Sequence, residues 1–369
     1  MNITFLIGNG FDRNLGLKTA YSDFVSYYKK LGTTDETLIK FHEHINENEE
    51  LWSSAEEEIG KYTEEFEEGE GAAFCKCHKD FCENLAKYLK GESQKVDYQY
   101  ISQNIEKAFS LMNSLSRPFP TEEREIINAA VSSYRNETTY FNFIVFNYTD
   151  TLDQCVSAIK GNQDVLGTHK YYTSTYSHAI GNIIHVHGTV DSQMVFGVND
   201  ESQISKPEIF YCENGDLYEQ ALIRRETNQG YREKTDEKSA KIVDESQIIY
   251  IYGMSIGITD TLWWERICRW LSDKSSRHLI VYRHSMPAMG LLAVEYKIEE
   301  RKAKQEITSF AKLQDEQKWN IEERIHITGE NMFAALKDAA KKSKSAGKSM
   351  DSSISEAHGD DAARAAALV

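Results

Sequence analysis

Short apolar runs alternate with helical patterns over much of the chain. The first run, residues 3–7, ends at a Gly-Asn-Gly turn, which is typical of a buried parallel strand that leads into a helix. Further apolar runs predict strands at residues 143–146, 183–187, 194–196, 248–252, 279–282 and 325–328. Helical patterns separate most of them, including residues 149–159 and 260–271. This alternation predicts an α/β fold with a Rossmann-like, doubly wound parallel sheet.

A long helical segment interrupts the alternation after the first strand and helix. Within it, apolar residues recur at steps of three and four, the spacing of one face of an amphipathic helix. They are Trp52, Ala55, Ile59, Tyr62 and Phe66. We therefore predict an α/β domain made of residues 1–34 and 140–335, with residues 35–139 as a large helical insertion.

Two other segments are polar and lack periodicity. Residues 227–241 carry mixed charges and predict a mobile loop or lid. Residues 340–369 are rich in Lys, Ser, Ala, Gly and Asp, a composition that predicts a disordered tail.

Four polar clusters fall where predicted strands stop. They are Gly8-Asn9-Gly10-Phe11-Asp12, Asn147-Tyr148-Thr149-Asp150, His185-Val186-His187-Gly188, and Gly253-Met254-Ser255 with Asp260. The carboxyl ends of the strands in a doubly wound sheet open onto one crevice, so we expect the four clusters to converge on a single ligand site.

The first two clusters have both a functional and a purely structural interpretation. Gly8 and Gly10 would let the backbone approach a phosphate, but Arg13 occupies the third glycine position of the dinucleotide fingerprint, so a dehydrogenase is not indicated. A tight turn with Asp12 near a helix N-terminus is the alternative. An amide such as Asn147 can orient a water or a ribose hydroxyl. Asp150 would bind the ligand or simply begin the next helix.

The other two clusters add a base and a hydroxyl. His185 and His187 are two apart on a predicted strand and so share a face; His187 at its end suits a general base with a near-neutral pKa. The alternatives are metal ligation by the two histidines with Asp12 or Asp150, or one buried and one exposed histidine. Ser255 suits a phosphate or ribose. The tryptophans after Asp260 predict core packing.

Composition and charge narrow the class of protein. The chain is 40% hydrophobic and 27% charged, as in ordinary globular proteins, and its net charge of −16 makes nucleic acid an unlikely partner. No apolar run approaches the roughly 20 residues of a membrane helix, and no basic leader is present, so we expect a cytoplasmic protein with no membrane partner. Eleven glutamates and one lysine lie between Glu47 and Glu70, which predicts a solvated helix face on the insertion.

Cysteine usage predicts neither disulfides nor a metal. Six cysteines are too sparse for a disulfide framework. Only Cys75, Cys77, His78 and Cys82 cluster, and they lack the spacing of a zinc site. We expect no bound metal.

The ordered set of motifs resembles the AbiH-like abortive infection family of bacterial antiphage proteins and, more distantly, the sirtuin superfamily. The matching segments are LIGNGFDRNLGLKTAYSDF, VFNYTDTLD, IIHVHGTV followed by MVFGVND, and IYGMSIGITD. The resemblance runs from residue 3 to about residue 285 and is loose over the insertion.

The sirtuin likeness implies residue roles. Asn147 would position water or the ribose of NAD, His187 would act as base on a ribose hydroxyl, and Ser255 would contact the nucleotide. The residues expected to bind NAD are Gly8, Asn9, Gly10, Phe11, Asp12, Asp150, Gly188, Gly253, Ser255 and Asp260. The four-cysteine zinc ribbon of protein deacylases is absent, so the resemblance implies hydrolysis of NAD to nicotinamide and ADP-ribose.

The resemblance thus implies an antiphage effector with NAD as its substrate. Such an effector would act as a homo-oligomer or with a second defence-system protein. The alternatives are a non-catalytic nucleotide sensor and a metal-dependent hydrolase or nuclease that uses the two histidines.

Overall fold

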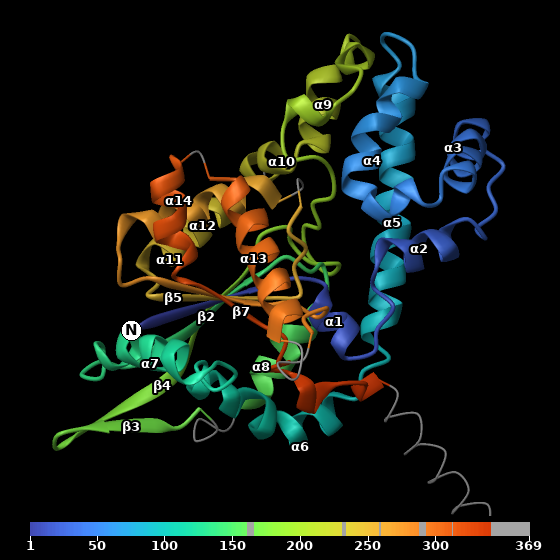
Figure 1. Ribbon diagram of the computed structural model, residues 1–369. Coiled ribbons are helices and arrows are strands. Elements are labelled where there is room, and N and C mark those ends of the chain that lie inside the picture. Colours follow the sequence, from blue (N-terminus) through green and yellow to red (C-terminus); the bar gives the residue numbers. More distant parts are fainter. Residues whose placement is uncertain (161–165, 231–233, 258–259, 288–292, 312, 341–369) are drawn as a thin grey trace, which may run out of the picture.

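The computed structural model describes residues 1–340 apart from 161–165, 231–233, 258–259, 288–292 and 312. Within these residues seven strands form one sheet, in the order β3-β4-β2-β1-β5-β6-β7 (Figure 1). The strands are β1 (Asn2–Ile7), β2 (Thr139–Val145), β3 (Thr168–Tyr171), β4 (Ser174–His185), β5 (Ile248–Tyr252), β6 (His278–Tyr282) and β7 (Ile325–Thr328). Only β3, at one edge, pairs antiparallel. The predicted α/β class with a mostly parallel sheet is confirmed.

The central strand, β1, is the point where the chain changes direction across the sheet. From β1 the chain moves through β2 to β4 on one side and then through β5, β6 and β7 on the other. Ligands of open α/β sheets bind outside the carboxyl ends of the strands at such a point. The turns after β1 and β5 therefore flank the position where a ligand is expected.

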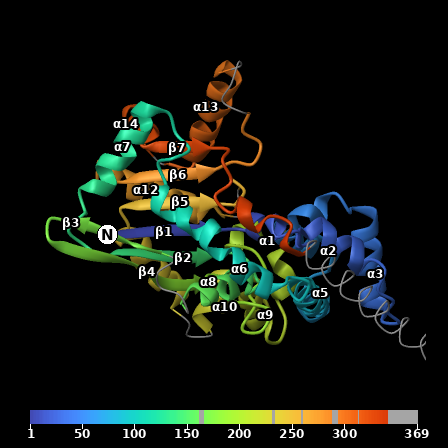
Figure 2. The same cartoon turned by 90° about the horizontal axis from the view of Figure 1, so that it is seen from below.

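Helices cover both faces of the sheet (Figure 2). On one face, Phe5 and Phe143 pack in a cluster with α6 (Tyr98–Phe109) and α8 (Thr151–Lys160). On the other, Leu6 and Ile251 pack in a cluster with residues of α11, α12, α13 and α14. Burial on both faces explains why β1 reads as a continuous apolar run rather than an alternating one. The four helices named last are α11 (Thr235–Glu245), α12 (Thr261–Asp273), α13 (Ala293–Ser309) and α14 (Asp315–Glu322).

A second group of helices stands beside the carboxyl end of β1 (Figure 1). These helices enclose their own core, in which Trp52, Phe81, Phe196 and Leu222 are buried together. The remaining α-helices of the described residues are α1 (Gly10–Asn14), α2 (Tyr21–Tyr28), α3 (Glu36–Glu47), α4 (Ala55–Lys61), α5 (Gly71–Ser93), α7 (Thr121–Ser132), α9 (Gly215–Leu222) and α10 (Arg224–Gly230). The predicted division into an α/β domain and a helical insertion stays a prediction.

Within residues 35–139, helices occupy the chain up to the start of β2 at Thr139, as the helical patterns predict, with one change of detail. The stripe predicted as one amphipathic helix is three consecutive short helices, namely η1 (Leu51–Ser54), α4 and η2 (Tyr62–Glu65). Its apolar residues are nevertheless buried together, as the spacing predicts.

Three sequence-based predictions differ from the structure or fall outside it. The strand at residues 194–196 is wrong: Phe196 is buried because its ring stacks on Phe81 with centroids 5.1 Å apart, while its carbonyl oxygen pairs with Nε2 of His78. The lid at 227–241 is also wrong where it is described, because α10 and α11 occupy most of it. The tail at 341–369 lies outside the described residues. The sequence analysis missed β3.

Candidate functional site

A cavity of about 170 Å³ lies where the turns after β1, β2, β4 and β5 meet. Among the predicted site residues it is lined by Gly8, Asn9, Asp12, Asn147, His187, Gly253, Ser255 and Asp260. The other lining residues are Thr19, Tyr21, Glu56, Leu85, Leu89, Phe146, Tyr148, Thr149 and Met254. The structure therefore brings residues of all four sequence clusters to one cavity.

The glycines of the first and last clusters pack against each other. The amide of Gly8 donates to the carbonyl oxygen of Tyr252, and that of Gly10 to the carbonyl oxygen of Gly253, both at 2.9 Å. A Cβ atom on Gly10 would lie 2.4 Å from the Cα of Gly253, which itself has φ +70°. Glycine is thus required for contact between the two turns. Approach of Gly8 and Gly10 to a phosphate stays a prediction.

Two polar side chains of the first cluster are held by the protein itself. Asp12 is buried and accepts hydrogen bonds from the hydroxyls of Thr149, at 2.6 Å, and Thr151. Burial raises the pKa of Asp12, although the two hydroxyls favour its charged form. The amide of Asn9 donates to the carbonyl oxygen of Thr19 at 2.8 Å. These bonds connect the turn after β1 to neighbouring segments and fix the cavity wall.

Asn147 and His187 present unpaired polar atoms to the cavity. Their residues are 5% and 8% exposed, and among the described residues neither amide atom of Asn147 nor Nδ1 of His187 meets a partner in hydrogen-bonding geometry. The Asn147 side chain is nevertheless close enough to Asp12 to favour the charged form of that carboxyl. Leaving a buried polar group unpaired costs about 1–3 kcal/mol, so such a group usually meets a partner, which can be a protein group, a water or a ligand. A ligand with hydrogen-bonding groups would satisfy both side chains.

The imidazole of His187 is neutral in this environment. Burial, together with the positive charge of Arg224, lowers its pKa to about 3. The near-neutral pKa expected from the sequence is therefore wrong. A neutral His187 can still accept a hydrogen bond from a ligand hydroxyl.

His185 is the last residue of β4, whereas His187 lies in the turn that follows the strand. The two histidines do not line the cavity together, contrary to the expectation of a shared face. Nε2 of His185 lies 2.7 Å from a carboxylate oxygen of Asp153, and Nδ1 lies 3.1 Å from the carbonyl oxygen of Asn147. Burial opposes the charged form, but Asp153 outweighs it and raises the pKa of His185. A charged His185 would donate to both acceptors and hold the peptide of Asn147.

Four predicted site residues lie outside the lining of this cavity. Phe11 is buried against Phe333, and Gly10 packs against the backbone of Gly253 in the turn after β5. Asp150 precedes α8 and accepts a hydrogen bond from Gln154 at 2.9 Å, as a residue at a helix start would. Gly188 has φ +67° and forms the turn after His187. For Phe11 and Asp150 the geometry favours the structural interpretation.

Helix α4 contributes to the cavity a carboxylate that was not predicted from the sequence. Glu56 of α4 accepts hydrogen bonds from the hydroxyls of Tyr21, at 2.6 Å, and Tyr148, at 3.1 Å. Its other oxygen lies 2.6 Å from Nη1 of Arg224. Burial favours the neutral acid, but Arg224 and the hydroxyls outweigh it and lower the pKa of Glu56, which is therefore ionised. No local pattern distinguishes Glu56 from the glutamates around it.

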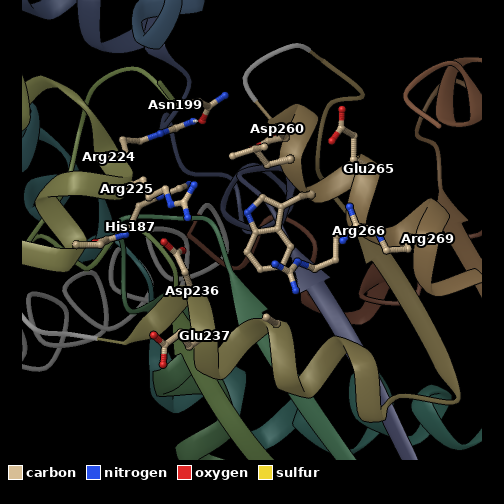
Figure 3. Close-up of a pocket in the computed structure, with 14 residues that line it drawn as sticks. His187, Asn199, Arg224, Arg225, Asp236, Glu237, Asp260, Glu265, Arg266 and Arg269 are labelled. Carbon is tan, nitrogen blue, oxygen red and sulfur yellow. Dashed lines mark hydrogen bonds between the residues drawn. The ribbon is translucent and has the colours of Figure 1, made fainter. Parts of the chain in front are cut away.

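A larger cavity of about 350 Å³ adjoins the first and shares His187 and Asp260 with it (Figure 3). Burial raises the pKa of Asp260 to about 7, with Arg224 opposing the shift. The other lining residues are Asn199, Arg224, Arg225, Asn228, Asp236, Glu237, Ala240, Leu262, Trp263, Glu265, Arg266 and Arg269. Trp264 and Trp270 are buried in the core as predicted, whereas Trp263 lines this cavity.

Ligation of a metal by the two histidines finds no support in the geometry. His185 is bound to Asp153, and no group of three His, Cys, Asp or Glu side chains in the described parts of the chain is placed to hold a metal ion. The helices that the structure describes also include none long and apolar enough to span a bilayer.

The fold and the cavities define a mixed α/β protein with a polar site at the carboxyl ends of its strands. The model of the family described as "Bacteriophage abortive infection AbiH" matches residues 4–282, about three quarters of the chain. The chain belongs to the AbiH family. Neither the curated proteins nor the solved structures include a match to it.

Proposed function

We propose that this protein is an abortive-infection effector that binds NAD in a Rossmann-like, doubly wound sheet and hydrolyses it to nicotinamide and ADP-ribose. The observation that carries the proposal is the pair of unpaired buried groups, the Asn147 amide and the His187 imidazole, in a cavity beside Gly8 and Gly253. Membership of the AbiH family supports the antiphage role. The distant likeness of the same positions to those of sirtuins supports NAD as the ligand.

The proposed reaction assigns one task to each of the two groups. The glycosidic bond between the ribose and the nicotinamide nitrogen breaks, and both electrons go to the ring, which leaves as a neutral molecule. Asn147 orients the water that forms the new bond to the ribose carbon, and the proton lost by that water passes to solvent. Nδ1 of His187 accepts a hydrogen bond from a ribose hydroxyl and positions the sugar.

The size of the site is compatible with a dinucleotide only if both cavities are used. Pockets for ligands of this class measure roughly 300–1,000 Å³. The smaller cavity, at about 170 Å³, would hold the nicotinamide end alone. The adjoining 350 Å³ cavity supplies the remaining volume, and His187 lies at the junction.

The test is nicotinamide release from NAD by the purified full chain, with Asn147→Ala and His187→Ala as site variants. Asp150→Ala is the matched control, because Asp150 belongs to the same sequence cluster but does not line the cavity. Loss of turnover in the site variants with turnover retained in the control supports the mechanism. Turnover that survives both site substitutions would exclude it.

One observation favours a second function, binding of the nucleotide without cleavage. The pKa of about 3 makes His187 a weak base in the unliganded cavity. If the protein is a sensor, calorimetry should detect binding of NAD or ADP-ribose, and Asn147→Ala should weaken that binding. No nicotinamide should form, even when extract of infected cells is added.

A further inference from the structure

Three arginine side chains gather in the lining of the larger cavity. Arg225, Arg266 and Arg269 line it, and among the described residues none of the three forms an ion pair. By contrast, Arg224 in the same wall is paired with Glu56. Guanidinium groups bind phosphate oxygens with two parallel hydrogen bonds, so unpaired ones in a cavity are suited to a phosphorylated ligand.

The three arginines approach the cavity from two elements. Arg225 extends from α10, and Arg266 and Arg269 extend from α12 on the other side (Figure 3). On α12, Trp263, Arg266 and Arg269 recur at steps of three residues, which places neighbours in this series on adjacent turns of one helix face. An aromatic ring and two cationic groups therefore follow one another along the same wall.

Among the described residues, the four carboxylates that line the cavity form no ion pair with the three arginines. Glu237 lies 3.2 Å from the ammonium group of Lys234. Burial raises the pKa of Asp260 to about 7, so its carboxyl carries only part of a charge near neutrality. Burial raises the pKa of Asp236, and the positive charges of Arg225 and Arg266 oppose that shift, although Asp236 forms no ion pair with either arginine. Hydrogen-bond donors on Arg266 and Arg269 stay available to a ligand.

We propose that the larger cavity is the binding site for a nucleoside diphosphate moiety. Arg225, Arg266 and Arg269 hold the two phosphates, and the base lies against the indole of Trp263. Aromatic side chains stack on bases in nucleic-acid complexes, and this is the role expected of Trp263. This assignment rests on the proposed function for the orientation of the dinucleotide. The ADP moiety of NAD would lie in the larger cavity and its nicotinamide end in the smaller one.

The test is calorimetric binding of ADP, inorganic pyrophosphate and adenosine to the full chain, at low and at high salt. We expect ADP to bind with one-to-one stoichiometry, pyrophosphate more weakly and adenosine most weakly. Loss of a charged hydrogen-bond donor weakens binding roughly tenfold or more, so Arg266→Gln and Arg225→Gln should each raise the Kd for ADP by at least that factor. Added salt should weaken ADP binding in the wild type and less in either variant.

Arg301→Gln is the matched control, because Arg301 is an exposed arginine of α13 that does not line the cavity. It should leave the Kd unchanged. Trp263→Phe, which keeps an aromatic ring, should bind ADP better than Trp263→Ala and should leave pyrophosphate binding unaltered. Thermal melts show whether each variant is folded. If Arg266→Gln is not folded, Arg225→Gln takes its place in the test.

The outcomes separate this proposal from the preceding one. If ADP does not bind, or if the arginine variants bind it like the wild type, the nucleoside diphosphate site is overturned even where NAD is cleaved. If ADP binds and the arginine variants bind it more weakly, while no nicotinamide is released from NAD, the nucleoside diphosphate site is supported and the proposal of NAD hydrolysis is rejected.

Discussion

Arg224 and Glu56 form a buried ion pair, with 2.6 Å between Nη1 and Oε2, that joins α10 to the helical segment containing α4. The two side chains are 5% and 15% exposed. The hydroxyls of Tyr21 and Tyr148 occupy the remaining carboxylate oxygen. Because Glu56 lines the smaller cavity and Arg224 the larger, this pair fixes the wall between the two.

Removal of Glu56 should destabilise the protein strongly. Glu56→Ala leaves the guanidinium of Arg224 buried without its carboxylate, and breaking a buried ion pair in this way costs about 3–5 kcal/mol. The free energy of unfolding, measured in urea, should fall by an amount of that order.

The matched control for this prediction is the neighbouring Glu57→Ala. Glu57 is 37% exposed, and among the described residues its one ion pair is with Lys61. Exposed pairs contribute about 0–1 kcal/mol. An equal decrease in the free energy of unfolding in the two variants would show that the buried Glu56–Arg224 pair stabilises the protein no more than an exposed pair does.

The pKa values of His185 and His187, at and just beyond the end of β4, should be shifted in opposite directions from the ordinary histidine pKa. Burial lowers the pKa of His187 to about 3, whereas Asp153 raises the pKa of His185 against the effect of burial. Nitrogen chemical shifts of the two imidazoles across pH 5–8 should show His187 neutral throughout and His185 still charged above the usual histidine pKa of about 6.5.

The same shifts determine the pH dependence of stability. The unfolded chain takes up a proton at His187 below about pH 6.5 and the folded chain does not, so this residue makes the protein less stable as pH falls from 6.5 toward 3. For His185 the folded state binds the proton more tightly, so its contribution is present below about pH 6.5 and is lost as pH rises through its folded pKa. A neutral His185 and a charged His187 at pH 6 would contradict both assignments.

The parts of the site that were predictable from the sequence are those set by strands. Apolar runs located β1, β5 and β7 to within a residue, and polar residues directly after such runs had to meet at the carboxyl edge of a parallel sheet. This topological constraint is why Asn147, His187 and Gly253 line one cavity although about 40 and 66 residues separate them along the chain.

The parts that were not predictable depend on contacts between distant segments. Glu56 reads as one of many exposed glutamates, and its burial depends on Arg224, which lies 168 residues further on. Residues 194–196 look like a strand because they are apolar, but the cause of their burial is the helical core containing Phe81. The edge strand β3 was missed because its side chains are half-buried or exposed, so no apolar run indicates it.

The contact between the turns after β1 and β5 should tolerate no side chain. A Cβ atom on Gly10 would lie 2.4 Å from the Cα of Gly253, a backbone atom that cannot move aside without displacing β5. We therefore expect Gly10→Ala to lower the free energy of unfolding in urea by more than about 2 kcal/mol, within the range of strongly disruptive substitutions. Gly32→Ala is the control, because a Cβ atom there meets nothing within 4 Å, and it should change stability by at most about 1 kcal/mol. A Gly10→Ala protein as stable as the Gly32→Ala protein would mean that the two turns can separate, and the cavity between them would then not be a fixed feature of the fold.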